Sequence, residues 1–241
     1  MKLHHFFVSP QSLRGRVARI DDGGVAKQIA KVLRLKAGDE ILLLDGDGFE
    51  YTTKLTMASA KSVIGEIIHR QTNATEPELK ITLYQALLKK ENTEWAFQKC
   101  TEVGVATFVP IQTDRSEKLQ LHIERAQKII KEAAEQSGRG IIPKLEEPQS
   151  LADVLKRVCR ADVPNFILHS EGDMMKNVAR GKELFAVNMF VGPEGGWSDA
   201  ELEEFRRREK DGYPIQLVSL GARTLRAETA GVVAAGILLT R

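Results

Sequence analysis

The sequence predicts an α/β fold in which a small, strand-rich domain precedes a larger domain built around a parallel sheet. Two observations support this expectation. The first seventy residues contain mostly strand-like runs, whereas from Leu79 onward strand-like runs alternate with helical patterns. In addition, two glycine-bearing loops, 191–197 and 220–230, each follow a strand-like run and lead into a helix. We place the domains at residues 1–72 and 78–241.

The first domain is expected to be a compact β-barrel of a size often used for RNA binding. Strands are predicted at 40–45, 49–55 and 62–69, with a turn at Asp45-Gly-Asp-Gly and a short helix at 25–33. Residues 71–78 are polar and include a proline, so they are predicted to link the two domains.

The second domain is expected to alternate strands with helices. Strands are predicted at 79–86, 108–111, 165–169, 185–191 and 215–220. Helices are predicted at 92–103, 122–137, 151–159, 199–208 and 228–239. The first two of these helices should end at Gly104 and Gly138, because glycine suits a helix C-cap.

Length and composition are those of a globular protein. The 241 residues can form a small and a medium domain, each with its own core. No run of about 18 apolar residues suggests a membrane span, and the N-terminal apolar run is too short for a signal peptide. The only cysteines, Cys100 and Cys159, lack metal-ligand spacing, so neither a disulfide framework nor a metal site is expected. We therefore expect a cytoplasmic protein without a metal.

Positive charge is concentrated near the N-terminus. The whole chain has a formal net charge of +2, but up to Lys36 eight basic residues stand against Asp21 and Asp22. Clustered positive charge suits a polyanion such as nucleic acid. A solvated basic surface would have the same composition, so the segment alone leaves both interpretations open.

The first glycine loop, Val191-Gly-Pro-Glu-Gly-Gly-Trp, is expected to form one wall of a ligand pocket. Glycine lets backbone groups approach a ligand, and open α/β sheets bind ligands beyond the carboxyl ends of their strands. Ser198 and Glu201 have the spacing of a capping box, so a helix should follow. The loop lacks the Walker A and dinucleotide patterns, which disfavours phosphate, although a helix N-terminus could still take an anion. Glycines used only for a tight turn are the alternative explanation for this loop taken singly.

The second loop places Gly221 beside Arg223, Arg226 and Glu228. The helix that follows is rich in small residues and can pack closely against its own sheet or a partner subunit. An ion pair within the loop would also explain Arg226 and Glu228. If the strands are parallel, however, the strand ends at 168–169, 191–192 and 220–221 meet at one sheet edge, which favours one shared site.

Several segments, in this order, cover nearly the whole chain. The loops carry Gly192-Pro-Glu-Gly-Gly196 and Leu220-Gly-x-Arg-x-Leu-Arg-x-Glu-Thr-Ala230. Shorter segments are Val32-Leu-Arg-Leu, Leu44-Asp-Gly-Asp-Gly, Gln98–Gly104, Asp114-Arg-Ser and Glu132–Arg139. Together they resemble the RsmE family, the bacterial 16S rRNA uridine N3-methyltransferases of the SPOUT superfamily. Thr224 departs from the family pattern, which usually has an aliphatic residue there.

The resemblance implies a PUA-like barrel followed by a SPOUT domain whose chain forms a deep trefoil knot, a rare topology. It also implies S-adenosylmethionine as cofactor, a homodimer, and 16S rRNA in the small ribosomal subunit as substrate. The implied cofactor-binding residues are Leu168, His169, Gly192, Pro193, Glu194, Gly195, Gly196, Leu220, Gly221, Leu225 and Arg226. Backbone groups of Leu220 and Leu225 are expected to contact the adenine edge, because apolar side chains cannot.

The implied reaction is an in-line transfer of a methyl group from a sulfonium to N3 of uridine, and it needs no metal. Arg226 is predicted to stabilise negative charge on the uracil. Glu194 is a candidate general base, with a structural role in its loop as the alternative. Six arginines are predicted to contact RNA: Arg14, Arg16, Arg19, Arg34, Arg115 and Arg139. For Arg34 the alternative is a structural ion pair.

Two other functions fit parts of the pattern. One is a SPOUT methyltransferase acting on another rRNA or tRNA nucleotide. The other is a non-catalytic RNA-binding assembly protein, against which the intact glycine loops argue. A nucleotide-hydrolysing enzyme is disfavoured because the lysine and Mg²⁺ ligands of that chemistry are missing.

Overall fold

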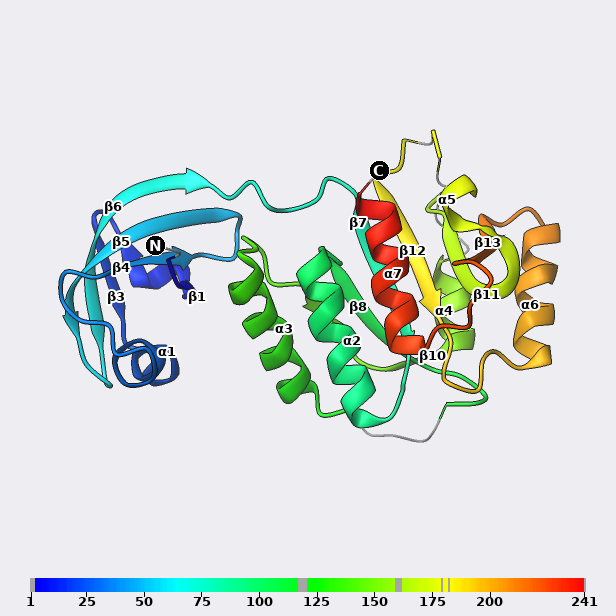
Figure 1. Ribbon diagram of the computed structural model, residues 1–241, viewed down its shortest axis with the longest axis horizontal. Coiled ribbons are helices and arrows are strands. Elements are labelled where there is room, and N and C mark those ends of the chain that lie inside the picture. The colour runs from blue at the N-terminus through cyan, green and yellow to red at the C-terminus, as the bar shows by residue number, and fades with distance from the viewer. Residues whose placement is uncertain (1–2, 117–120, 159–161, 179, 182, 241) are drawn as a thin grey trace. The chain divides into compact units, whose positions relative to one another are not determined.

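A computed structural model of the protein describes residues 3–116, 121–158, 162–178, 180–181 and 183–240. The chain forms two compact units (Figure 1). The first comprises Met1–Glu76 together with Ala134–Ile142, and the second comprises Pro77–Ala133 and Pro143–Arg241.

The first unit is built on a curved sheet whose described strands follow the order β1-β4-β5-β6-β3-β2 (Figure 1). These strands are β1 (His5–Phe7), β2 (Leu13–Arg14), β3 (Val17–Ile20), β4 (Glu40–Leu44), β5 (Phe49–Ala58) and β6 (Val63–Thr72). Only β1 and β4 pair in parallel among them. Short helical segments complete the unit: η1 (Pro10–Ser12), α1 (Gly23–Lys27) and η2 (Gln28–Val32). The predicted strand-rich first domain is confirmed.

Two elements of the first unit differ from the prediction. The helical segment begins before Val25, because the Asp22 carboxylate accepts hydrogen bonds from the backbone N–H groups of Gly24 and Val25. β6 extends to Thr72, into the predicted linker, because its last residues still pair with β5 as far as Phe49. The polar side chains there belong to an exposed strand end.

The segment Ala134–Ile142 belongs to the first unit, although the sequence placed it in the second domain. The Glu135 carboxylate accepts the backbone N–H of Phe7 at 2.9 Å. Arg139 is only 3% exposed and forms an ion pair with Glu76, with Nη2 and Oε2 2.7 Å apart. The prediction of Arg139 as an RNA contact is therefore wrong, because this buried pair withholds the guanidinium from phosphate.

The second unit contains a parallel sheet whose described strands follow the order β10-β8-β7-β12-β11-β13, with β9 beside β8. The strands are β7 (Lys80–Ala86), β8 (Thr107–Gln112), β9 (Lys144–Leu145), β10 (Gln149–Ser150), β11 (Asn165–Met174), β12 (Ala186–Val191) and β13 (Ile215–Ser219). The helices are α2 (Lys90–Val103), α3 (Ile123–Ser137), α4 (Leu151–Val158), α5 (Met175–Val178), α6 (Asp199–Lys210) and α7 (Ala227–Leu239). The predicted parallel α/β domain is confirmed. Cys159, the last residue of the helix predicted at 151–159, lies outside the described residues.

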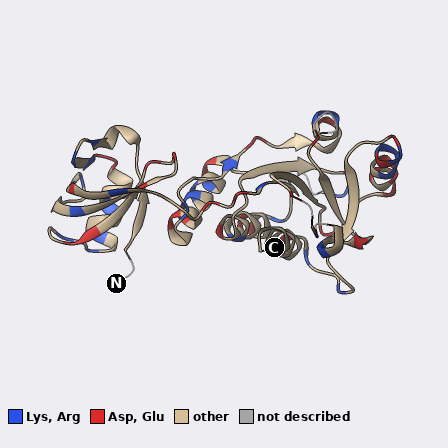
Figure 2. Cartoon of the chain, turned by 90° about the horizontal axis from the view of Figure 1, so that it is seen from above, with Lys and Arg blue, Asp and Glu red and all other residues tan. Residues whose placement is uncertain are grey.

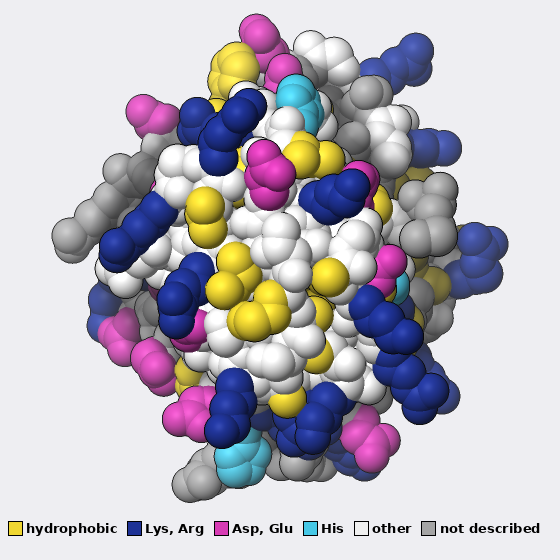
Figure 3. All heavy atoms as spheres, turned by 90° about the vertical axis from the view of Figure 1, so that its left-hand side faces the viewer, with side chains coloured by type: hydrophobic (Ala, Val, Ile, Leu, Met, Phe, Trp, Pro, Cys, Tyr) yellow, Lys and Arg dark blue, Asp and Glu magenta, His cyan; other side chains and the backbone are white. Residues whose placement is uncertain are grey.

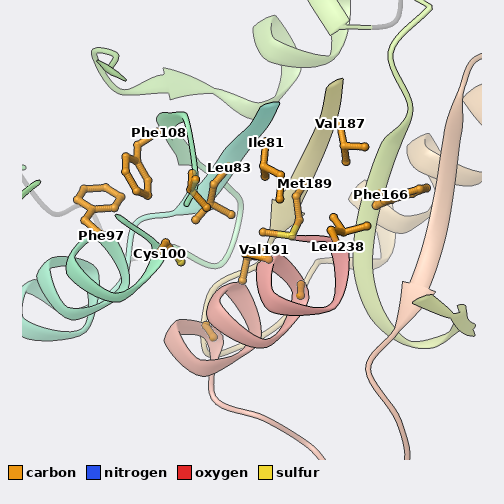
Figure 4. Close-up of a cluster of buried hydrophobic side chains, with 14 of the residues drawn as sticks. Ile81, Leu83, Phe97, Cys100, Phe108, Phe166, Val187, Met189, Val191 and Leu238 are labelled. Carbon is orange, nitrogen blue, oxygen red and sulfur yellow. The ribbon is translucent and has the colours of Figure 1, made fainter. Parts of the chain in front are cut away.

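Helices cover both faces of this sheet, so successive strand residues enter different cores. Leu83 and Met189 pack with α2 and α7, as Figure 4 shows, whereas their neighbours Tyr84 and Phe190 pack with α4 and α6. The rings of Tyr84 and Phe190 stack with centroids 4.4 Å apart. These two apolar layers fix the strand order that brings the loops together.

Strands β12, β11 and β13 are adjacent and parallel, so their carboxyl ends point to the same edge of the sheet. β11 is longer than predicted because its pairing with β13 shifts register between Leu168 and Asp173. At Gly172 an added Cβ would lie 2.4 Å from the backbone nitrogen of Val218, so the two backbones approach closely there. A knot is defined by one segment of chain passing through a loop formed by another, which strand order and pairing do not describe. The trefoil knot therefore stays a prediction.

Replacing Arg139 by alanine should lower the free energy of unfolding by about 3–5 kcal/mol, because it leaves the Glu76 carboxylate buried without its partner. Urea denaturation followed by circular dichroism would measure the change. Arg16→Ala removes an exposed arginine of the same unit and should change stability by less than about 0.5 kcal/mol. Similar losses in both variants would contradict a structural role for Arg139.

Candidate functional site

A pocket of about 860 Å³ opens at the carboxyl edge of the parallel sheet in the second unit. Its walls come largely from three segments of neighbouring strands and the loops that follow them: 168–170 within β11, 191–197 from the end of β12 onward, and 218–228 from the end of β13 onward. All eleven residues predicted to bind cofactor line this pocket. The structure thus brings the predicted set together, while the role of each residue in cofactor binding stays a prediction.

The first glycine loop turns sharply and is anchored by Trp197. The turn closes with a hydrogen bond from the Gly196 N–H to the Pro193 carbonyl at 2.9 Å, and Gly196 has a φ of +69°, which favours glycine. Trp197 is 3% exposed, and its indole Nε1 donates to the Leu168 carbonyl at 3.0 Å. A Cβ added at Gly192 would lie 3.1 Å from the indole, so glycine is needed there for packing.

Polar contacts at the start of α6 also hold this loop in place. The Ser198 and Glu201 side chains form the predicted capping box at the start of α6. Glu201 Oε1 also accepts the backbone N–H of Asp114 at 2.9 Å, and the Ser198 hydroxyl donates to Asp114 Oδ2 at 2.6 Å. The loop after β8 is thereby fixed to the loop after β12.

Arg115 and Asn92 reach the glycine loop from two other elements. Arg115 Nη1 donates to the Gly195 carbonyl at 3.0 Å, and Asn92 Nδ2 in α2 donates to Glu194 Oε1 at 3.3 Å. Sequence reasoning assigned Arg115 to RNA and did not single out Asn92 or Asp114. The segment Asp114-Arg-Ser was itself a signal, because it stood among the segments that carried the family resemblance.

The second loop presents few side chains and much backbone. Gly221 has a φ of +120°, and its N–H donates to the Ser219 hydroxyl at 3.2 Å. Arg226 is the N-cap residue of α7 and has an exposed side chain, whereas Glu228, two residues later, is 7% exposed. Among the described ion pairs none joins Arg226 to Glu228. The simple loop ion pair weighed from the sequence is therefore not what positions them.

Cys100 is buried on the face of α2 that meets α7. Burial raises the pKa of the Cys100 thiol well above its usual range, so the thiol stays protonated and is no nucleophile. Its sulfur would lie 3.5 Å from a Cβ added at Gly231 of α7, which shows how closely these helices pack.

The remaining predicted RNA contacts lie in the first unit and are exposed: Arg14, Arg16, Arg19 and Arg34. Arg19 pairs with Asp21 at 2.9 Å on the surface, and Arg34 has a positive φ of 56° shortly after the end of η2. Lys and Arg are spread over this unit in Figure 2, and in Figure 3 they surround a smaller group of apolar side chains. The four arginines therefore remain available to a polyanion.

Family profiles match both parts of the chain. An RNA methyltransferase domain matches residues 75–239, and an RNA methyltransferase PUA domain matches residues 21–68. The fold and the pocket thus define the class as an RNA methyltransferase with a PUA domain.

No helix among the described residues is long and apolar enough to cross a membrane.

Curated relatives narrow this class. The ribosomal RNA small subunit methyltransferase E of Bacillus subtilis is 33% identical, covering 88% of this chain and 86% of that protein. The protein of the same name from Aquifex aeolicus is 31% identical, covering 98% and 99%. The chain belongs to the ribosomal RNA small subunit methyltransferase E family, which confirms the resemblance found in its loops.

Two solved structures have the same fold as this chain over nearly its full length. The methyltransferase E of Neisseria gonorrhoeae bound to S-adenosyl methionine superposes with a TM-score of 0.87 at 27% identity, covering 99% of this chain and 98% of that chain. A putative methyltransferase of Legionella pneumophila with the same cofactor bound gives 0.85 at 28% identity, covering 100% and 98%.

Replacing Gly192 by valine should displace the Trp197 indole and lower stability by about 1–3 kcal/mol, because the added side chain meets the ring. In a Trp95→Phe background Trp197 is the remaining tryptophan, so its fluorescence reports the displacement as a shift to longer wavelength. Gly23→Ala, where an added Cβ meets nothing within 4 Å, is the control. Unchanged emission in Gly192→Val would show that the ring does not depend on this glycine.

Proposed function

We propose that the protein transfers a methyl group from S-adenosylmethionine to N3 of a uridine in 16S rRNA of the small ribosomal subunit. The supporting observation is the convergence of three glycine-bearing or strand-end segments on one pocket, in a chain that superposes along its length on structures with that cofactor bound. The name of the curated relatives supplies the substrate, small-subunit ribosomal RNA.

The pocket residues fit this cofactor. A volume of about 860 Å³ lies in the range of sites for small ligands, about 300–1,000 Å³. The backbone at Gly195, Gly196 and Gly221 borders open or loosely filled space, because a Cβ added there would meet nothing or only Arg115 at 3.6 Å. The missing side chains therefore leave these backbone groups accessible to a ligand. Leu220 and Leu225 offer apolar walls, and we assign their backbone groups to the adenine edge. When bound, the cofactor supplies an activated methyl group on a sulfonium.

The chain's own residues have three tasks in this reaction. They must hold the base in line, exclude water, and stabilise the charge that develops on the base. Arg226, exposed at the pocket beside the N-terminus of α7, is assigned the third task. The target base must be presented unpaired, because N3 is hidden in a base pair.

We assign Arg14, Arg16, Arg19 and Arg34 to phosphate contacts, which supply affinity and register. Arg115 is reassigned to holding the cofactor loop, because its guanidinium already donates to the Gly195 carbonyl.

We further propose that the protein acts as a homodimer through α7. After Glu228 this helix carries no charged residue, and one side of it packs on α2 and the sheet. Its other side is half-exposed and apolar or small at Val233 and Gly236, and the partly buried Ala230, Val232 and Ile237 lie at the margin of the packed side. A helix that is apolar all round is normally buried, which favours a second copy as the cover.

The decisive experiment incubates the protein with labelled S-adenosylmethionine and small subunits from a strain that lacks the modification. The methylated nucleotide is then mapped by mass spectrometry. Label at N3 of one 16S uridine is expected. Label on tRNA or on another rRNA nucleotide would show that the proposed substrate is wrong. Binding of S-adenosylmethionine without any methyl transfer would favour a non-catalytic assembly protein.

Replacing Arg34 by alanine should weaken binding to small-subunit RNA and lower the slope of log affinity against log salt by about 0.7, because one phosphate contact is lost. Cofactor affinity, measured by calorimetry, should not change. Lys210→Ala removes one exposed charge at the end of α6 and serves as the control. Equal losses of RNA and cofactor affinity in Arg34→Ala would assign Arg34 to the fold instead.

A further inference from the structure

We propose that Glu228 accepts the N3 proton of the target base and thereby selects uracil over cytosine. This inference rests on the proposed methyl transfer to N3. It gives a role to a buried carboxylate that the sequence analysis weighed only as half of a loop ion pair.

Glu228 occupies the first turn of α7 and lines the pocket. The side chain is 7% exposed, so a carboxylate is held at the wall of the site rather than in solvent. The N-terminal end of a helix favours a nearby negative charge. The location therefore suits an ionised carboxylate that acts on a bound group.

One oxygen of this carboxylate has no protein partner. Among the described residues, Glu228 Oε2 is buried without a hydrogen bond. Buried polar atoms are nearly always paired, and an ionised carboxylate can only accept. The Gln85 side chain lies close to Gly231 of α7, but its Nε2 donates to the Ala86 carbonyl at 3.2 Å, and among the described residues no hydrogen bond joins it to Glu228 Oε2. A donor from the substrate would complete the site.

Uracil provides one donor at the reacting position. On its Watson–Crick edge the N3–H lies between two carbonyl acceptors, whereas N3 of cytosine carries no proton and is itself an acceptor. A carboxylate facing N3 therefore binds uracil and repels cytosine. Unpaired donors and acceptors are costly in a buried site, so one such group can decide which base is used.

The proton transfer balances with the methyl transfer. As N3 forms its bond to the methyl carbon, the carbon–sulfur bond breaks and its electron pair stays on sulfur, which becomes a neutral thioether. The N3–H electron pair remains on nitrogen, and the proton passes to Glu228 Oε2. Arg226, two residues earlier on the pocket wall, faces the transient negative charge of the base.

Two other pocket residues are weaker acceptors. Glu194 is exposed and already accepts a hydrogen bond from Asn92. His169 Nδ1 accepts the backbone N–H of Glu171 at 3.3 Å, so in the neutral ring its other nitrogen carries the proton. Glu228 is the remaining carboxylate or imidazole in the described wall that has a buried, unpaired acceptor.

The test compares Glu228→Gln with Glu203→Gln, an exposed substitution of the same kind in α6. Single-turnover methyl transfer to unmodified small subunits should fall at least about 100-fold in Glu228→Gln, the size of a lost general base. The lost rate should return progressively as pH rises, because solvent then removes the N3 proton. S-adenosylmethionine affinity and the dimer dissociation constant should match those of wild type in both variants.

A second measurement addresses base selection. Subunits with cytosine in place of the target uridine should bind wild type more weakly, and Glu228→Gln should reduce this preference because an amide can donate to cytosine N3. Three results would overturn the inference: a near wild-type rate, a loss of rate matched by a loss of cofactor affinity or dimer, or a reduced rate with the wild-type pH profile. A wild-type protein that methylates no small subunit would instead refute the proposed function.

Discussion

The contact between the Trp197 indole and the backbone of Gly192 is the constraint on which the candidate site depends. The ring can lie there only because Gly192 has no side chain, and from that position it donates a hydrogen bond to the Leu168 carbonyl. Two neighbouring strand ends are thus fixed to each other by one buried side chain. The parallel sheet brings the third, after β13, to the same edge. A pocket made largely of backbone needs such an anchor, because glycine-rich loops have high conformational freedom.

A second set of contacts links this anchor to the rest of the unit. Asp114 bridges the loop after β8 to the start of α6, and Arg115 holds the Gly195 carbonyl. The residues that line the pocket and those that position its glycine loop therefore come partly from different parts of the chain. Arg115 shows what charge alone does not reveal: an arginine near a pocket also donates to a carbonyl of its own protein.

The chemical groups at the pocket are few, in keeping with a reaction whose methyl donor is already activated. The Cys100 thiol lies in the core between α2 and α7 and is kept protonated by burial. What distinguishes the site is the contrast between two groups on one helical turn, an exposed cation at Arg226 and a buried carboxylate at Glu228. A base that gains a methyl group while losing a proton needs both kinds of group close by. The PUA-like unit contributes exposed arginines, which suit sequence-independent contact with phosphate.

The sequence by itself determined the parallel α/β domain and the strand-rich first domain, which follow from local patterns: apolar periodicity, glycine at helix ends, and loops placed directly after strands. The set of predicted cofactor residues came from the resemblance of the glycine loops to a known family, and neither source singled out Asn92, which also lines the pocket. Only the tertiary structure showed the ion pair of Arg139, the hydrogen bond of Arg115 and the burial of Glu228, since no local pattern encodes a distant partner or burial. Glu76 and Arg139 are far apart in the chain and meet because the end of α3 packs within the first unit. Burial and pairing are properties of the folded chain, so a sequence can indicate which residues reach a site but not which of them remain free to act there.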